Sequence, residues 1–278
     1  MKKSMLVLTA AICLTSCAGR AVVKDNNSKN NSAGTAPVEP VVVKKKAETA
    51  KLDLSQLSRK SVGYGQGVQV DDKNRTIGAV DFNEKYGGLK AKAINNDEKI
   101  YLTFDQGYEN GYTSKILDVL KEKNVKATFY LLQDYAEKNP DLVQRMIDEG
   151  HTIGNHSVHH YSMPTLNQAE CEKEIMDFHK YMEDNYGYEM TSFRPPKGEF
   201  SEFSLGVTAN CGYETELWSF AYADWDVNNQ PDEAQSLEKL VNAVHPGAIY
   251  LLHSVSQTNA NILGDFIDEV RNKGYAFG

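Results

Sequence analysis

The sequence lacks clusters of positive charge, internal repeats and long hydrophobic runs. Its 278 residues carry a formal net charge of −8, and no basic stretch occurs beyond Lys44–Lys46. This balance argues against nucleic acid as the main partner. Hydrophobic residues make up only 41% of the chain, and their deficit is concentrated near the N-terminus. The length still suffices for one good-sized core or two small ones.

Cysteine is also scarce, and two of the four cysteines lie near the N-terminus. Two lysines precede the apolar run Met5–Ile12, which is too short to span a bilayer as a mature helix and is typical of an export signal. Leu14–Cys17 then resembles the end of a bacterial lipoprotein signal, where a Cys becomes lipidated. The alternative is an ordinary secretory signal that happens to end in Cys. We expect residues 1–17 to be a lipoprotein signal with lipidated Cys17, and the protein to be exported and lipid-anchored on the outer face of a bacterial membrane.

The remaining cysteines admit two interpretations. Cys13 would leave with the signal peptide and Cys17 would carry lipid, which leaves Cys171 and Cys211. In an exported protein these two can form a disulfide or stay as free thiols, and the sequence does not decide between them.

Three segments follow the signal. Residues 18–58 are rich in Asn, Ser, Lys, Val and Pro without a sustained period, which predicts a disordered tether. Residues 59–98 contain several glycines and mixed signals, and we expect an irregular N-terminal collar that packs on the domain. Residues 99–278 alternate apolar strand patterns with amphipathic helix patterns, which predicts βα units around a parallel sheet or barrel. The expected strands are 100–104, 127–132, 151–155, 192–194, 214–218 and 248–252, and the expected helices are 113–123, 141–149 (capped by Asp141), 168–185, 233–244 and 262–273.

The ends of these expected strands carry polar motifs. In a parallel barrel the active groups gather at the C-terminal strand ends. His156 and His160 are four residues apart, so a single helical turn would point both the same way and could hold a divalent metal. Two histidines in a polar loop are the alternative. The other polar residues at strand ends are Asp105, Arg194, Asp224 and His253.

These residues suit metal-assisted hydrolysis. Asp105 could act as general base for the attacking water, although a turn Asp that caps the next helix is common. Arg194 precedes two prolines and could orient Asp105, or form a salt bridge at the rim. Asp224 could hold the imidazole of His253 in its charged form, which would make His253 a general acid rather than a satisfied core His. Lys197 could meet an anionic substrate group, or be a solvated surface Lys.

These motifs, in this order, resemble the NodB-type polysaccharide deacetylases (carbohydrate esterase family 4) over roughly residues 99–278. Thr103–Thr113 (Thr-Phe-Asp-Gln-Gly-Tyr-Glu-Asn-Gly-Tyr-Thr), Arg194–Ser201 and Asp224–Asn228 look like the δ-lactam-biosynthetic de-N-acetylase branch. The resemblance implies an α/β fold, a distorted and incomplete (β/α) barrel. By position it implies the following roles: Asp105 as catalytic base, His156 and His160 as metal ligands, Arg194 as partner of the base, Asp224 as the acid that tunes His253, His253 as general acid, Trp225 and Leu251 as pocket walls, with Pro196 and Lys197 as further substrate-binding candidates.

The sequence departs from the family at two positions. Most members carry a second Asp as third metal ligand where this chain has Gln106, and the δ-lactam branch usually has Asn there. Gln106 can bind through its carbonyl oxygen, but more weakly than a carboxylate. We expect a divalent ion, zinc first, with its identity and affinity open. Ala221 replaces an Asp often found three residues before Asp224, and we expect little effect.

The resemblance implies a metal-dependent hydrolase of linear amide bonds. In that branch the enzyme removes acetyl from N-acetylmuramic acid in peptidoglycan from which the stem peptide is already gone, and the product closes to the muramic-δ-lactam of spore cortex. The implied partners are the glycan strand, the membrane and an upstream amidase. The alternatives are an N-acetylglucosamine deacetylase on peptidoglycan or chitin-like polymer, and a non-catalytic glycan-binding lipoprotein.

Overall fold

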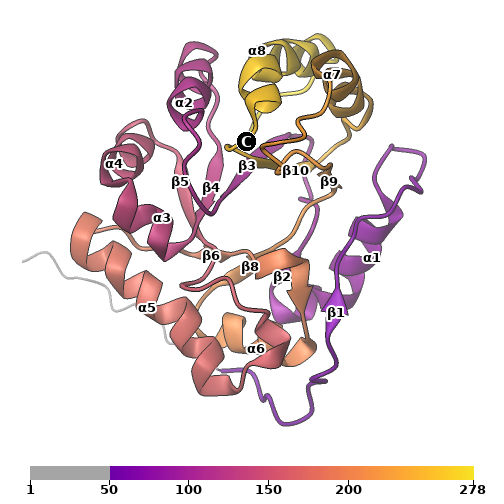
Figure 1. The fold of residues 1–278 in the computed structure, drawn as a ribbon. Coiled ribbons are helices and arrows are strands. Elements are labelled where there is room, and N and C mark those ends of the chain that lie inside the picture. Colours follow the sequence, from indigo (N-terminus) through magenta and orange to yellow (C-terminus); the bar gives the residue numbers. More distant parts are fainter. Residues whose placement is uncertain (1–50) are drawn as a thin grey trace, which may run out of the picture. The chain divides into compact units, whose positions relative to one another are not determined.

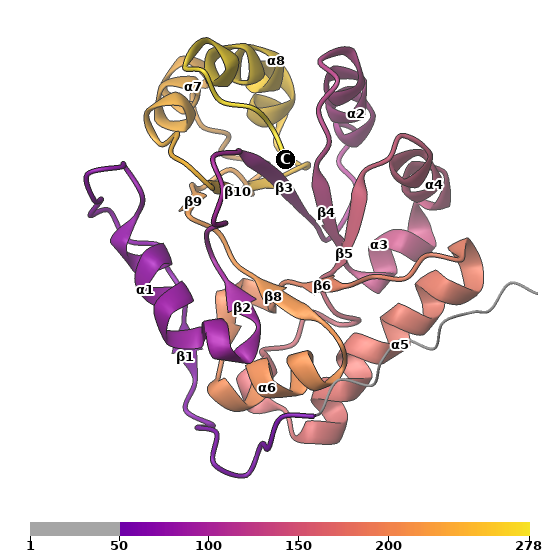
Figure 2. The same ribbon diagram turned by 180° about the vertical axis from the view of Figure 1, so that it is seen from behind.

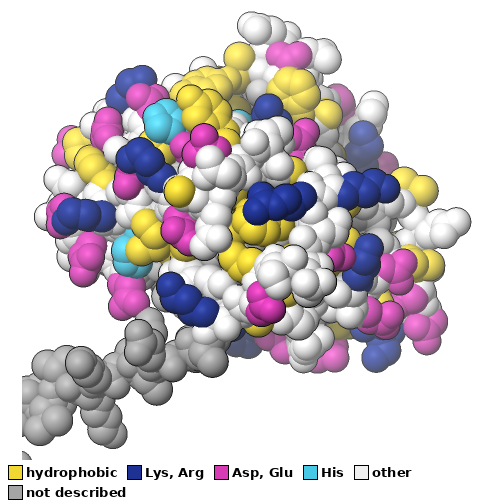
Figure 3. Space-filling model, turned by 90° about the horizontal axis from the view of Figure 1, so that it is seen from below, with side chains coloured by type: hydrophobic (Ala, Val, Ile, Leu, Met, Phe, Trp, Pro, Cys, Tyr) yellow, Lys and Arg dark blue, Asp and Glu magenta, His cyan; other side chains and the backbone are white. Residues whose placement is uncertain are grey.

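The computed structural model describes residues 51–278, and the predicted signal, Cys13, Cys17 and most of the predicted tether lie outside this part of the chain. Within residues 51–278, no helix combines the length and apolar character needed to cross a membrane. Seen from below, the surface carries acidic and basic side chains interspersed (Figure 3), in keeping with the absence of a basic cluster in the sequence.

An eight-stranded, wholly parallel sheet forms the centre of the domain, and it curls with its helices on the outside (Figure 1). The strand order is β2-β8-β6-β5-β4-β3-β10-β9. The sheet does not close, because β2 and β9 are its two free edges, so the predicted distorted, incomplete (β/α) barrel is confirmed. The strands are β2 (Ala91–Lys92), β3 (Tyr101–Gln106), β4 (Thr128–Leu131), β5 (Thr152–Asn155), β6 (Ser192–Phe193), β8 (Glu214–Glu216), β9 (Phe220–Ala221) and β10 (Ile249–His253).

Eight helices accompany the sheet in the described part of the chain. They are α1 (Ile77–Tyr86), α2 (Thr113–Glu122), α3 (Gln133–Lys138), α4 (Pro140–Asp148), α5 (Gln168–Tyr186), α6 (Glu202–Asn210), α7 (Glu233–Asn242) and α8 (Gln257–Asn272). The sequence patterns predicted α2, α4, α5, α7 and α8, but α8 begins five residues earlier than expected. Asp141 does not cap α4, because Asn139 is the N-cap and Asp141 lies in the first turn.

The sheet has two buried faces with different contents. Leu102 and Phe104 of β3 belong to the larger core between sheet and helices, and Phe104 stacks on Phe129 with ring centroids 5.2 Å apart. The intervening residues Thr103 and Asp105 are also buried, and they face the inside of the curl. Alternation along β3 therefore places a hydrophobic set outside and a polar set inside.

The N-terminal segment closes the gap between β9 and β2. Figures 1 and 2 both place α1 beside this gap, and α1 packs on an inner apolar cluster with Trp218 and Leu251. Gln66 Nε2 donates to the carbonyl of Ala221 in β9 at 3.2 Å, and Tyr64 Oη donates to the carbonyl of Trp218 at 2.6 Å. The prediction that residues 59–98 are irregular is wrong at α1. The apolar residues of α1 show only a weak helical periodicity, so the sequence pattern did not predict this helix.

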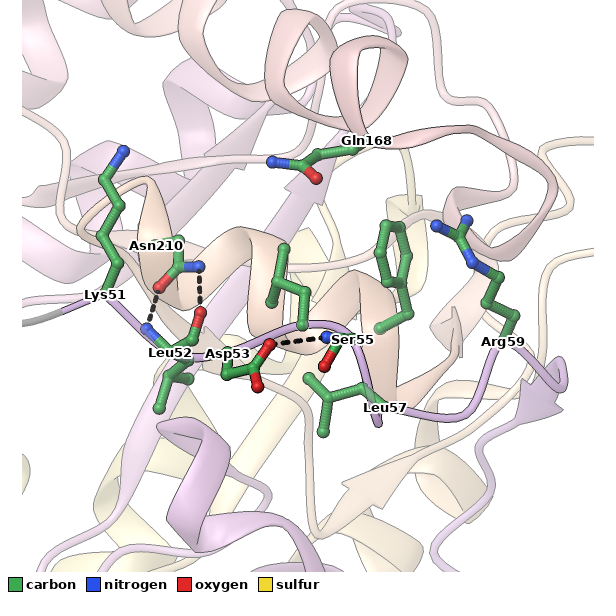
Figure 4. Close-up of a pocket in the computed structure, with 10 residues that line it drawn as sticks. Lys51, Leu52, Asp53, Ser55, Leu57, Arg59, Gln168 and Asn210 are labelled. Atoms are coloured by element: carbon green, nitrogen blue, oxygen red, sulfur yellow. Dashed lines mark hydrogen bonds between the residues drawn. The ribbon is translucent and has the colours of Figure 1, made fainter.

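Residues 51–58, which we assigned to the tether, pack on α6 (Figure 4). Asn210 clamps the backbone of Leu52, since its Oδ1 accepts from Leu52 N at 2.7 Å and its Nδ2 donates to Leu52 O at 3.0 Å. Leu54 and Leu57 lie so close to Gly206 that a Cβ there would come within 2.7 Å of both. The packed domain therefore includes residues 51–58.

Cys171 and Cys211 are free thiols.

Candidate active site

The carboxyl ends of neighbouring strands surround a cavity of about 400 Å³. Asp105 is the last residue but one of β3, His156 follows β5 and His253 ends β10, so the parallel register brings these distant residues to the same edge of the sheet. In β10 and β3, His253 pairs directly with Asp105. The cavity is lined by Asp105, Gly107, Tyr108, Leu132, His156, His160, Trp225, His253 and Val255.

The two histidines meet on a loop rather than on a helical turn. Residues 156–160 are irregular, and Ser157 and His160 have left-handed φ angles of 83° and 60°. The helical reason for the spacing is therefore wrong, although the rings do approach, with centroids 5.0 Å apart. Ser157 Oγ accepts from His160 N at 2.9 Å, and Asn155 Oδ1 accepts from Ser157 N at 2.8 Å. These two hydrogen bonds hold Ser157 and His160 in their strained left-handed conformations.

Glu174 of α5 fixes the same loop from outside. Its carboxylate is buried and accepts from the backbone N of His159 at 2.8 Å and from the ring Nδ1 of His159 at 2.6 Å. Its backbone carbonyl accepts from Val158 N at 3.2 Å. No sequence signal pointed to Glu174, because it lies in the middle of an amphipathic helix that otherwise packs normally.

The protonation of the histidine pair fits metal ligation. His156 Nδ1 lies 2.8 Å from the carbonyl oxygen of Arg194, which can only accept, so Nδ1 carries the proton and Nε2 is free to bind a cation. Burial lowers the pKa of His156, and burial together with the neighbouring His156 lowers the pKa of His160 to about 4. Both rings are therefore neutral near pH 7, as metal ligands must be.

Gln106 is the third ligand that the family resemblance suggests. It is fully buried, and its Nε2 donates to Ser254 Oγ at 2.8 Å. Its Oε1 is buried without a hydrogen-bond partner, so an acceptor there is unused, but Gln106 is not among the residues that line the cavity. Among residues 51–278, no three His, Cys, Asp or Glu side chains are arranged to hold an ion. An ion at this site would take the two imidazoles plus an amide oxygen or water.

Arg194 is fully buried and makes Asp105 a fixed carboxylate. Arg194 Nη1 donates to Asp105 Oδ1 at 2.8 Å and to Thr103 Oγ1 at 2.7 Å. Burial alone would raise the pKa of Asp105, but the charge of Arg194 above all, together with its hydrogen bond and the charge of His253, outweighs burial and lowers the pKa. Asp105 Oδ2 stays free of Arg194 and lies 3.6 Å from His156 Nε2. Arg194 and Asp105 therefore form the pair that the sequence suggested. Because Arg194 is fully buried, this pair is not a salt bridge at the rim.

Three residues that the sequence did not single out support Arg194. Its guanidinium lies over the ring of Tyr130 at 4.1 Å, and Glu216 Oε1 is 3.7 Å from Arg194 Nη2. Tyr130 Oη donates to Glu216 Oε1 at 2.9 Å. Gly154 makes room for Tyr130, since a Cβ there would come within 2.4 Å of its ring. A Tyr, a Glu and a Gly inside strands look like ordinary sheet residues, so no pattern could identify them.

Asp224 and His253 form a second buried pair. His253 Nδ1 donates to Asp224 Oδ1 at 2.7 Å, and His253 N donates to Asp224 Oδ2 at 2.8 Å. Burial alone would lower the pKa of His253, but the charge and hydrogen bond of Asp224 outweigh it, and the pKa is raised. Asp224 itself is fully buried. The raised pKa favours the protonated form of His253. Because Nδ1–H is bonded to Asp224, the proton on Nε2 is the one that remains available.

The predicted substrate-binding residues divide into two sets. Trp225 lines the cavity and its side chain is 60% exposed. Leu251 belongs to the inner apolar cluster, and neither it nor Pro196 nor Lys197 lines the cavity. Leu251 lies two residues before His253 on the same face of β10, so it supports the site from one layer below. Lys197 is exposed with a left-handed φ of 59°.

Comparisons with known proteins agree with this geometry. The family model described as polysaccharide deacetylase matches residues 92–215. The peptidoglycan-N-acetylmuramic acid deacetylase PdaA of Bacillus subtilis is 44% identical over 185 residues, which is 66% of this chain and 70% of that protein. A peptidoglycan-N-acetylglucosamine deacetylase of Bacillus cereus is 34% identical over 202 residues, 70% of each chain. The solved structure of B. subtilis PdaA, a family 4 carbohydrate esterase, superimposes with a TM-score of 0.75 at 37% identity, covering 80% of this chain and 95% of that one.

Proposed function

The chain belongs to the polysaccharide deacetylase family, carbohydrate esterase family 4, and we propose that it removes the N-acetyl group from peptide-free N-acetylmuramic acid in peptidoglycan. As a member of this family it is a hydrolase that acts on amide bonds. The proposed product carries a free amine beside a lactyl carboxylate, and these two groups can close to muramic-δ-lactam.

One observation supports the chemistry above all others. A carboxylate with a lowered pKa and an imidazole with a raised pKa, Asp105 and His253, lie on paired residues of neighbouring strands and line one cavity. Groups whose environments push their pKa values apart are suited to act as base and acid in one reaction. A turn Asp that caps a helix and a core His would give no reason for both residues to line the same cavity.

His156 and His160 would hold a divalent cation, with Gln106 Oε1 as the candidate third protein ligand. Such an ion supplies Lewis-acid polarisation of the acetyl carbonyl and of water. The chain's contribution is to keep both imidazoles neutral, to fix the tautomer of His156 through the Arg194 carbonyl, and to hold the loop through Ser157 and Glu174.

Asp105 acts as the general base in this proposal. Arg194 holds Oδ1, so the carboxylate is oriented with Oδ2 toward His156 and the cavity. Oδ2 takes the proton of the attacking water as the C–O bond forms. The low pKa of Asp105 keeps it ionised before the reaction begins, and the buried Arg194 prevents its rotation away from the cavity.

His253 acts as the general acid. Nδ1 is engaged by Asp224, so Nε2 carries the proton that is given to the nitrogen as the C–N bond breaks. The products are acetate and the free sugar amine. Because Asp224 is buried and bonded also to the backbone of His253, it fixes both the charge and the orientation of the ring.

The substrate, the role in spore cortex and the lipid anchor are proposed from the similarity to a relative and from the sequence. PdaA of B. subtilis, whose name states N-acetylmuramic acid as substrate, is the relative with 44% identity. The amino-acid sequences of Thr103–Thr113 and Arg194–Ser201 support membership of the δ-lactam branch and a role in spore cortex. The lipoprotein-like start supports a lipid-anchored protein outside the membrane, acting after an amidase has removed the stem peptides.

Product analysis tests this function. Peptidoglycan treated beforehand with an amidase, and untreated peptidoglycan, are incubated with the protein, and the glycan fragments are analysed by mass spectrometry. We expect loss of acetyl groups from muramic residues only after amidase treatment. Loss from glucosamine residues in both samples would instead support the N-acetylglucosamine activity stated in the name of the B. cereus relative.

A further inference from the structure

The loop that follows Asp105 carries an exposed aromatic side chain into the active-site cavity. Tyr108 lines the cavity although its side chain is 51% exposed. It is three residues from Asp105, yet no hydrogen bond or ring contact joins it to Asp105 or His253. Its ring therefore has no evident part in proton transfer, and it leaves a large apolar face open to solvent at the mouth of the site.

The residues after Tyr108 are tied down tightly. Glu109 Oε1 accepts from Gly111 N at 2.6 Å and from Thr113 N at 3.4 Å, and its Oε2 accepts from the hydroxyls of Thr113 and Tyr135. These bonds fasten the loop to the first turn of α2 and to α3. Gly111 has a φ of 85°, which allows the tight turn.

A second hydrogen bond fastens the loop to the segment just after β10, the strand that carries the general acid. Asn110 Nδ2 donates to the carbonyl of Val255 at 2.9 Å, two residues beyond His253. Tyr108 is therefore displayed from a loop whose next residues are fixed to three different elements. An exposed ring on a fixed backbone loses little conformational freedom when it meets a ligand.

The sheet order places Tyr108 relative to the other exposed aromatic of the cavity. Tyr108 follows β3, Trp225 follows β9, and β10 with His253 lies between them (Figure 1). The two aromatic residues thus stand on either side of the strand that bears the general acid. A chain of sugar rings laid across the mouth would meet both, with its reacting acetamide over Asp105 and His253.

We infer that Tyr108 is a specificity-determining residue for the proposed reaction: its ring stacks on the C–H face of a sugar next to the one that loses its acetyl group. Sugar rings present an apolar face to aromatic side chains, and such contacts resemble other aromatic packing in strength. The inference rests on the proposed function and adds that the site recognises more than one sugar of the strand.

Binding measurements test the inference independently of turnover. Isothermal titration calorimetry in an Asp105→Asn background compares a peptide-free peptidoglycan tetrasaccharide with N-acetylmuramic acid alone. Tyr108→Ala is expected to weaken tetrasaccharide binding about tenfold and to leave monosaccharide binding unchanged. Tyr108→Phe and Tyr108→Trp are expected to retain the affinity, since the ring rather than the hydroxyl is used.

Tyr161→Ala is the matched control, because Tyr161 is 53% exposed but does not line the cavity. It is expected to bind both ligands like the parent. Equal tetrasaccharide affinity in the parent and in Tyr108→Ala would overturn the inference, as would an equal loss for the monosaccharide. Acetate release by the wild-type protein from the same tetrasaccharide is measured separately, so failure of the proposed function would appear there and not in the binding data.

Discussion

Asp224 holds His253 by two bonds at once, with Oδ1 accepting from the ring Nδ1 at 2.7 Å and Oδ2 accepting from the backbone N at 2.8 Å. One buried carboxylate therefore sets both the charge and the direction of the ring. Asp105 on the neighbouring strand is held in a comparable way by Arg194. The site thus contains two carboxylates with opposite tasks, one exposed to the reaction and one hidden behind an imidazole.

The first prediction concerns pH. Activity needs His253 protonated, so it falls as pH rises through the pKa of His253, which Asp224 raises above the ordinary 6.5. Asp224→Asn removes the charge but keeps an acceptor, so the pKa falls and the alkaline limb of kcat/KM moves to lower pH. The ion pair also stabilises the folded state below the unfolded-state pKa, and this contribution is lost as pH rises through the raised folded-state pKa.

The pH profile of kcat/KM measures this shift, with Asp226→Asn as the neighbouring control. The carboxylate of Asp226 accepts from the backbone N of Asn228, and its carbonyl accepts from Gln230 Nε2 and from the backbone N of Asn229; none of these bonds involves His253. An alkaline limb at the same pH in wild type and Asp224→Asn would show that His253 is not the group that titrates there.

The second prediction concerns Glu174, which binds the backbone and ring of His159 without touching His156 or His160. Glu174→Ala releases the loop that carries both imidazoles, and we expect divalent-metal affinity to fall about 10–100-fold, as for other groups that orient ligands. Glu174→Gln keeps one acceptor and should lose less. Zinc affinity is measured by competition with a chelator. Glu183→Ala, exposed on the same helix, should bind zinc like wild type, and a similar affinity in Glu174→Ala would refute the positioning role.

The third prediction concerns Gln106, whose Oε1 is buried without a partner. Gln106→Asp supplies a carboxylate, so we expect zinc affinity to rise about tenfold or more. Without metal the buried charge is unpaired, so the thermal midpoint should fall, and added zinc should restore it. Gln106→Leu provides no ligand atom and should bind more weakly than wild type. Equal affinity in all three proteins would mean that residue 106 is not a ligand.

The fourth prediction concerns Lys197, which does not line the cavity but whose charge contributes to the lowered pKa of His160. We propose that it meets the lactyl carboxylate of the muramic residue. Lys197→Ala should then reduce kcat/KM on muramic substrates and leave that on glucosamine substrates unchanged. The ratio of the two rates is the measurement, and a ratio equal to that of wild type would reject this role for Lys197.

Much of the architecture could be predicted because βα units leave periodic patterns. Leu102 and Phe104 alternate as one face of β3 must, and Ile100 continues the pattern just before the strand. Of the polar residues at strand ends, Asp105, His156 and His253 do line the cavity. The N-terminal closure could not be predicted. α1 has little amphipathic pattern, since it covers a gap between edge strands and buries only Ala79, Phe82 and Tyr86.

The site shows a similar division. Spacing identified His156 and His160 for a geometric reason that the structure does not support, since strained loop residues rather than a helix bring them together. Residues that act through others, such as Glu174 and Tyr130, are ordinary members of a helix and a strand in the sequence. Their role depends on long-range contacts, which a single sequence does not display.

Acetate release from peptide-free glycan strands tests the central claim most directly. We expect steady release by the wild-type protein with divalent metal present, and a loss of about 10²–10⁴-fold in both Asp105→Asn and His253→Gln, with the fold of both variants retained. Release at the wild-type rate by either variant would contradict the assignment of Asp105 as base and His253 as acid.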